Sequence, residues 1–135
     1  MKKIVSLFLV FLICVSCCFS VTADGIQPRW NALSALGTDL SRYNGIYNNA
    51  EIFAVADTLD YTVRIDMNVT IVRWNGKVYE DTSTYWNASN TGAVSISHKF
   101  HLSAGNYKAR TTVKLYDANG NYIETVVGYS DEIII

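Results

Sequence analysis

The feature that most constrains this chain is a strict alternation of apolar and polar side chains. Across residues 61–71 every odd position is apolar and every even position is polar. Successive side chains of a β-strand point to opposite faces of a sheet, so this period predicts a strand with one buried face and one face in water. The pattern recurs over residues 94–102 and 107–115. The aromatic side chains that it places in the core are Tyr61, Phe100 and Tyr107.

Turn signals separate these runs. Asn-Gly pairs at 44–45, 75–76 and 119–120 are typical of tight hairpins. The expected strands are 30–43, 46–57, 60–74, 77–88, 94–102, 106–117 and 121–130. Trp30, Leu33, Leu36 and Leu40 have a spacing that could form a turn of helix, but we favour a strand there. About seven strands with turns every 10 to 15 residues predict an all-β fold, a two-sheet antiparallel sandwich of immunoglobulin or fibronectin type, with an open barrel as the alternative.

The Gly105-Asn106-Tyr107 segment supports the sandwich. It resembles the tyrosine corner of such domains, in which a Tyr near the start of the penultimate strand bonds back to a nearby backbone group. Ala109 then stands where an antibody domain has its second cysteine. We therefore expect the sheets to be held together by packing rather than by a disulfide.

The first 23 residues have the pattern of a secretory signal peptide. Met1-Lys2-Lys3 is a positive start, residues 4–13 are an apolar run, and residues 21–23 offer small side chains before a cut at Asp24. We expect secretion of one domain, residues 24–135. The alternatives are an uncleaved anchor, for which the run is short, or a lipid anchor at Cys17.

All three cysteines lie in this signal, so residues 24–135 can form no disulfide or Cys-ligated zinc site. Without Lys2 and Lys3, 9 basic side chains face 12 acidic ones, and no basic cluster occurs. A nucleic-acid-binding function is therefore not expected.

The sequence offers no recognisable catalytic or metal site. His98 and His101 fall on opposite faces of a strand and cannot share a metal, and we expect His98 to be a core or edge residue bonded to backbone. Residues 117–121 resemble a calcium loop, but the glycine is misplaced and a plain hairpin is favoured. Catalytic motifs with a glycine-flanked serine or paired histidines are missing from the sequence. We expect no enzyme activity and no cofactor.

Aromatic residues provide the candidate ligand-binding site. Its members are Trp74, Tyr79, Tyr85 and Trp86. Trp74 adjoins a predicted hairpin tip, on the polar face of its strand, and exposed aromatics there could stack on sugar rings or hold a peptide. The alternative is that Trp86 or Trp30 fills the core between the sheets.

The chain ends in three isoleucines, Ile133 to Ile135. They either close a last strand, which we favour, or form an adhesive edge for a partner.

Three segments carry a resemblance to a known group of proteins. They are residues 26–30, residues 105–110, and Glu124-Thr125 with Tyr129-Ser130. Together they resemble short secreted single-domain proteins of unknown function from spore-forming Gram-positive bacteria. The resemblance implies bacterial export and carries no site residues, because the activity of that family is not established.

These features favour a secreted, non-catalytic binding module for an extracellular or cell-surface glycan or protein. One alternative is a bacteriocin-like or toxin-like effector that engages a membrane or receptor through the C-terminal isoleucines and surface aromatics. Another is a hydrolase that uses scattered acids such as Glu51, Asp66 or Glu124. The ligand and the oligomeric state are not determined by the sequence.

Overall fold

The computed structural model describes residues 30–43 and 48–135, and these residues form an all-β fold. The strands are β1 (Leu33–Arg42), β2 (Asn49–Thr58), β3 (Arg64–Trp74), β4 (Tyr79–Thr91), β5 (Ala93–His101), β6 (Asn106–Tyr116), β7 (Tyr122–Tyr129) and β8 (Ile133–Ile134). The predicted signal peptide, Cys17, residues 26–29 and the Asn44-Gly45 turn lie outside the described residues.

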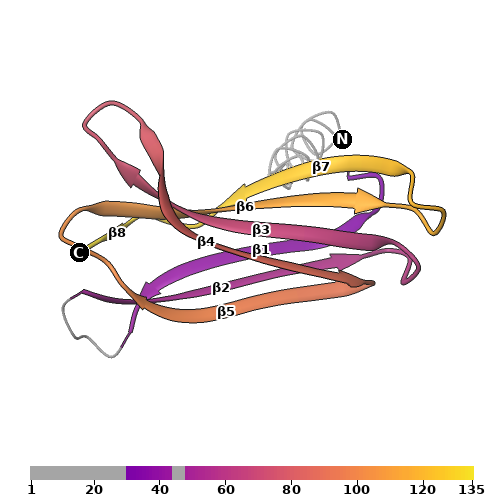
Figure 1. Cartoon of the computed structure of the whole chain (residues 1–135), viewed down its shortest axis with the longest axis horizontal. Helices are drawn as coiled ribbons and strands as arrows, with labels where there is room; N and C mark the ends of the chain where they lie inside the picture. Colours follow the sequence, from indigo (N-terminus) through magenta and orange to yellow (C-terminus); the bar gives the residue numbers. More distant parts are fainter. Residues whose placement is uncertain (1–29, 44–47) are drawn as a thin grey trace, which may run out of the picture.

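The strands form two packed antiparallel sheets, which Figure 1 shows as two layers. The smaller sheet has the order β1-β2-β5, and the larger has the order β4-β3-β6-β7, with β8 paired to β6. The chain therefore changes sheets three times, between β2 and β3, between β4 and β5, and between β5 and β6. This confirms the predicted two-sheet sandwich of immunoglobulin or fibronectin type. Among the described residues, no helix is long and apolar enough to cross a membrane.

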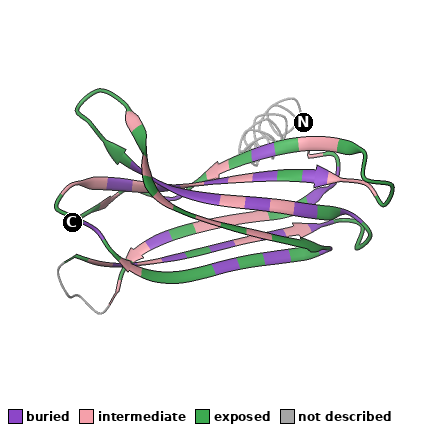
Figure 2. Ribbon diagram, viewed as in Figure 1, coloured by how far each residue is buried: buried purple, intermediate pink, exposed green. Residues whose placement is uncertain are grey.

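The core lies between the sheets, where the apolar members of the alternating runs meet. Along β2, β3, β5 and β6, buried residues alternate with half-buried or exposed ones over much of the strand (Figure 2). The largest fully buried apolar side chains are those of Ile52, Ile65, Met67, Val69, Ile71, Val72, Val113 and Leu115. One polar bridge crosses the core: the hydroxyl of Thr38 in β1 donates a 2.7 Å hydrogen bond to the hydroxyl of Thr111 in β6.

Two of the predicted Asn-Gly hairpins are confirmed. Gly76 and Gly120 have φ angles of +100° and +84°, which favour glycine. The carboxylate of Asp117 accepts hydrogen bonds from the backbone N–H groups of Asn119 and Asn121 and from the side chain of Asn121. These bonds hold the pKa of Asp117 below its ordinary value. Residues 117–121 therefore form a hairpin turn, as the sequence favoured.

The prediction that Tyr61 is a core residue is wrong, because its side chain is 78% exposed. Strand β3 begins only at Arg64, and Tyr61 belongs to a turn. The carboxylate of Asp60 accepts hydrogen bonds from the backbone N–H and the hydroxyl of Thr62, and these bonds lower its pKa. Local bonding by Asp60 therefore ends the alternation before the strand starts.

Tyr107 is buried, as predicted, and its hydroxyl lies 3.0 Å from the hydroxyl of Ser103. The bond of this tyrosine corner thus goes to a side chain four residues upstream instead of the backbone. Ala109 is fully buried and faces the core.

The terminal isoleucines close the larger sheet. Ile133 and Ile134 pair with Tyr107 and Asn106, and Ile135 exchanges two backbone hydrogen bonds with Gly105. Ile133 and Ile135 also pack against the core. The favoured prediction of a last strand is confirmed.

Candidate binding site

The candidate site lies on the face of the β4-β3-β6-β7 sheet that points away from the smaller sheet, which we call the outer face. Strand register places Tyr85, Thr70, Arg110 and Tyr129 in one row across these four strands. Directly paired residues point to the same side of a sheet. Tyr85 and Tyr129 are each 59% exposed, at the two edges of the row. Neighbouring strands are about 4.8 Å apart, so the two tyrosine backbones are separated by about 14 Å.

A shallow groove with a volume of about 540 Å³ lies beside this row. Its polar side chains come from three strands and are those of Asp66, Asn68, Asn87, Ser89, Thr112 and Lys114. Tyr116 closes one end, where the guanidinium of Arg64 covers its ring at 4.3 Å from the centroid. Tyr122, which is 59% exposed, meets Tyr116 edge-on at this end. The exposed tyrosines at the opposite end of the groove are Tyr85 and Tyr129.

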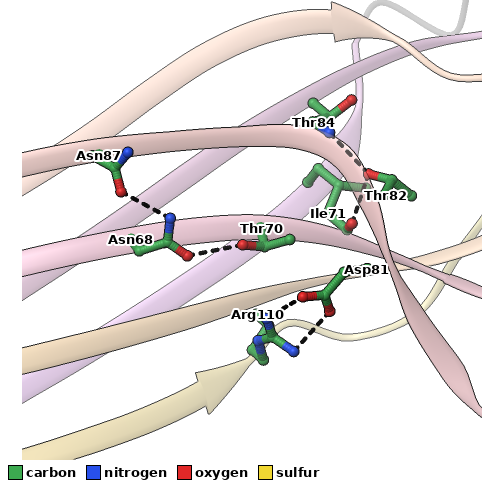
Figure 3. Close-up of polar contacts among 8 residues, drawn as sticks. All are labelled: Asn68, Thr70, Ile71, Asp81, Thr82, Thr84, Asn87 and Arg110. Carbon is green, nitrogen blue, oxygen red and sulfur yellow. Dashed lines mark hydrogen bonds and ion pairs between the residues drawn. The ribbon is translucent and has the colours of Figure 1, made fainter.

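Hydrogen bonds fix the polar floor of the groove. The Asn68 amide nitrogen donates to the Asn87 side-chain oxygen at 2.8 Å, and the Asn68 oxygen accepts from the Thr70 hydroxyl at 2.8 Å (Figure 3). Asp66 accepts a 2.6 Å bond from the Ser89 hydroxyl and forms a 3.3 Å ion pair with Arg64. These contacts hold amides, a hydroxyl and a carboxylate in set orientations before any ligand binds.

Arg110 is held across the face by two hydrogen bonds of 2.8 Å to the two carboxylate oxygens of Asp81 (Figure 3). This pairing is the main reason that the pKa of Arg110 is raised, and a hydrogen bond to Tyr129 adds to it. Tyr129 is in register with Arg110, so its exposed ring stands beside the ion pair. Because the guanidinium is engaged by Asp81, its charge is already balanced.

A bulge in β4 brings Asp81 to this position. The pairing of β3 with β4 shifts register between Thr70 and Val72. At the shift, the Thr82 hydroxyl donates to the backbone oxygen of Ile71 at 2.7 Å and accepts a bond from the backbone N–H of Thr84 at 3.2 Å (Figure 3). The extra residues bend β4 and aim Asp81 at β6.

Trp74 and Tyr79 lie on the same face beyond this bulge, as the last pair before the turn of the β3–β4 hairpin, which extends past the neighbouring strands (Figure 1). Their ring centroids are 5.2 Å apart. Trp74 is 40% exposed, whereas Tyr79 is bonded to Glu132 and has the Lys108 amine 5.1 Å from its ring centroid. The structure thus brings Trp74, Tyr79 and Tyr85 to one face.

Trp86 lies on the opposite side of β4 from Tyr85, because consecutive residues of a strand alternate. It is half-buried and packs against the core, as Trp30 does, which agrees with the alternative that a tryptophan fills the space between the sheets. Its ring stacks on His98 at 5.0 Å and 7° and meets Phe100 edge-on. His98 is exposed at the edge of the sandwich and stacks on this ring. We expected its imidazole to bond to the backbone, and the structure instead shows it packed against Trp86. His101 is exposed.

The three scattered acids do not converge. Glu51 belongs to β2 in the smaller sheet, and Asp66 is in β3 of the larger sheet. Glu124 accepts hydrogen bonds from the backbone N–H groups of Asn31 and Ala32 just before β1. Within residues 30–43 and 48–135, no three His, Cys, Asp or Glu side chains are grouped as a metal site would require.

Sequence reasoning missed most of the groove. Asn68, Thr112 and Lys114 were assigned only to the polar faces of their strands, and Tyr129 was not singled out for a site. The alternating pattern does mark each of these residues as solvent-facing. The missing information was which strands lie side by side. No protein-family model matches the chain, and no curated protein matches it in sequence.

Proposed function

We propose that this protein is a secreted, non-catalytic binding module that holds an extracellular or cell-surface glycan on the outer face. The observation that carries the proposal is the row Tyr85–Thr70–Arg110–Tyr129, in which two strongly exposed tyrosines stand beside a polar groove of about 540 Å³. Exposed large aromatic side chains on an otherwise polar face indicate a binding surface.

The polar groups of the groove favour a glycan over a protein. Amides and hydroxyls both donate and accept hydrogen bonds, as sugar hydroxyls do, and Asn68, Asn87 and Thr112 offer both kinds of group. The centre of a protein interface is more apolar and depleted in charge. The centre of this groove instead holds charged and amide groups, and the rings of Tyr85 and Tyr129 lie at its margin.

Export rests on the predicted signal peptide and on the resemblance to secreted bacterial proteins. The effector hypothesis is less well supported, because it used the C-terminal isoleucines, two of which pack against the core. The exposed side chain of this set is Ile134.

Retention of the full chain on immobilised polysaccharides and a glycan array tests the proposal. Tyr85→Ala and Tyr129→Ala should each weaken binding by about tenfold, because an aromatic contact at a binding surface is worth more than about 1 kcal/mol. The matched control is Phe53→Ala, since Phe53 is 48% exposed in β2 of the other sheet. An array with no bound glycan, or equal losses in all three variants, would contradict a glycan site on this face.

A further inference from the structure

The carboxylates in and beside the groove are paired with arginines, whereas one lysine has no carboxylate partner in the described part of the chain. This difference indicates the kind of glycan that the groove fits. Between the Tyr85 row and the Tyr116 row, the carboxylate on the outer face is that of Asp66, and Asp81 lies in the next row beyond Tyr85, beside Val72. Asp66 is paired with Arg64 and Asp81 with Arg110. The other cations on this face are Lys108, whose amine lies beside the Tyr79 ring, and Lys114, which is in register with Asp66 on β3 and Thr125 on β7.

Lys114 has no carboxylate partner among the described residues. Its neighbour Asp66 is already engaged by Arg64 and by the Ser89 hydroxyl, which leaves the ammonium group of Lys114 to complement a ligand. The side chain is exposed and lines the groove. Residues 24–135 as a whole carry a net charge of −3, so a positive balance in this groove is opposite in sign to the rest of the chain.

The distance between the tyrosine row and Lys114 sets the minimum length of the ligand. Arg110, in the row between the two exposed tyrosines, and Lys114 are four residues apart on β6. At about 3.4 Å per residue, this corresponds to about 14 Å along the strand. A single sugar ring cannot reach both the tyrosine row and the ammonium group. The groove is shallow and open, so a longer chain can lie along it.

We infer that the ligand is an acidic polysaccharide whose sugars carry carboxylates, with sugar rings on Tyr85 and Tyr129 and a carboxylate on Lys114. This inference rests on the proposed glycan-binding function. We specify carboxylated sugars because the groove offers amides that can bond sugar hydroxyls and one lysine, Lys114, that has no carboxylate partner among residues 30–43 and 48–135. A phosphate polymer would instead require a cluster of arginines and lysines.

A matched pair of polymers tests the inference: polygalacturonate and its fully methyl-esterified form differ in charge but share one sugar backbone. The full chain should bind polygalacturonate about fivefold more tightly, the range expected for one exposed ion pair, and the preference should fall as salt is added. Galacturonic acid alone should compete poorly, because it cannot span the groove.

Substitutions separate charge recognition from glycan binding. Lys114→Gln should abolish the fivefold preference and leave binding to the ester unchanged, and Tyr85→Ala should weaken binding to both polymers. Lys77→Gln, at the exposed tip of the β3–β4 hairpin, is the matched control and should change neither value.

The other possible results each count against the acidic-glycan inference, the proposed function or both. Equal binding to the two polymers would overturn the acidic-glycan inference and leave the proposed function standing. A preference that survives in Lys114→Gln, or is lost equally in Lys77→Gln, would overturn the role of Lys114. Binding of inorganic polyphosphate as tightly as polygalacturonate would overturn the carboxylate assignment. Failure to bind any glycan would overturn both proposals.

Discussion

The hydroxyl bridge between Thr38 and Thr111 joins the two sheets, and its energy can be measured by a double-mutant cycle. Thr111 is fully buried, whereas Thr38 is half-buried, and Thr38 donates the 2.7 Å bond. Valine has nearly the shape of threonine, so substitution removes the hydroxyl without opening a cavity. The two single variants therefore differ in which hydroxyl they leave behind.

The expected magnitudes follow from burial. Thr38→Val leaves the buried Thr111 oxygen without its donor and should lower the free energy of unfolding by about 2 kcal/mol, the cost of an unsatisfied buried polar group. Thr111→Val leaves the half-exposed Thr38 hydroxyl, which water can reach, and should cost about 1 kcal/mol. The double variant removes both hydroxyls and should lie within about 0.5 kcal/mol of the unsubstituted chain, giving a coupling energy of about 2 kcal/mol.

Urea unfolding of the full chain, followed by tryptophan fluorescence, measures these values. The melting temperature should fall by about 4–8 °C for each kcal/mol lost, as is typical of a domain of about 100 residues. A double variant as unstable as the sum of the single variants would refute the bridge. A larger cost for Thr111→Val than for Thr38→Val would refute the burial argument.

Four further substitutions test the core and the turns. Met67→Ala should lower the free energy of unfolding by about 2–5 kcal/mol, because the side chain is almost completely buried between the sheets, and an unchanged urea midpoint would contradict that placement. Gly92→Ala should be more destabilising than Gly120→Ala: both glycines have φ near +80°, but a Cβ at Gly92 would lie 2.9 Å from the ring of Tyr61 while one at Gly120 meets open space. Equal thermal shifts would argue against the Tyr61 contact. Hydrogen bonds from Asn121 lower the pKa of Asp117 in the folded chain, so the stability they contribute is present above the unfolded pKa of about 3.8 and is lost as the pH falls through the lower folded pKa. Asp117→Asn should therefore reduce the loss of stability measured below about pH 4, and identical pH profiles would contradict the role of this turn.

Much of the fold was predictable because its signals are local. The alternation over residues 94–102 and 107–115 identified β5 and β6, and Asn-Gly pairs placed the ends of the β3–β4 and β6–β7 hairpins. The same local reasoning failed at Tyr61, where the alternation continued by chance into a turn that Asp60 holds with its own side chain.

The candidate site was only partly predictable. Trp74 was identified because it falls on the polar face of its strand. Tyr85 and Trp86 are neighbours in one strand and therefore point to opposite faces, so placing one of them also places the other. The pairing of Arg110 with Asp81 could not be predicted, because it depends on a register shift near Thr82 that no pattern in the sequence indicates.

The sequence by itself determined which side of each strand faces water, since side-chain direction alternates with every residue. It also determined where two of the hairpins turn, because a glycine accepts the positive φ that other residues resist. Only the tertiary structure decided that Tyr85, Asn68, Lys114 and Tyr129 share one surface. These residues come from four strands, and their proximity depends on strand order and register, which are set by packing between segments distant in the chain.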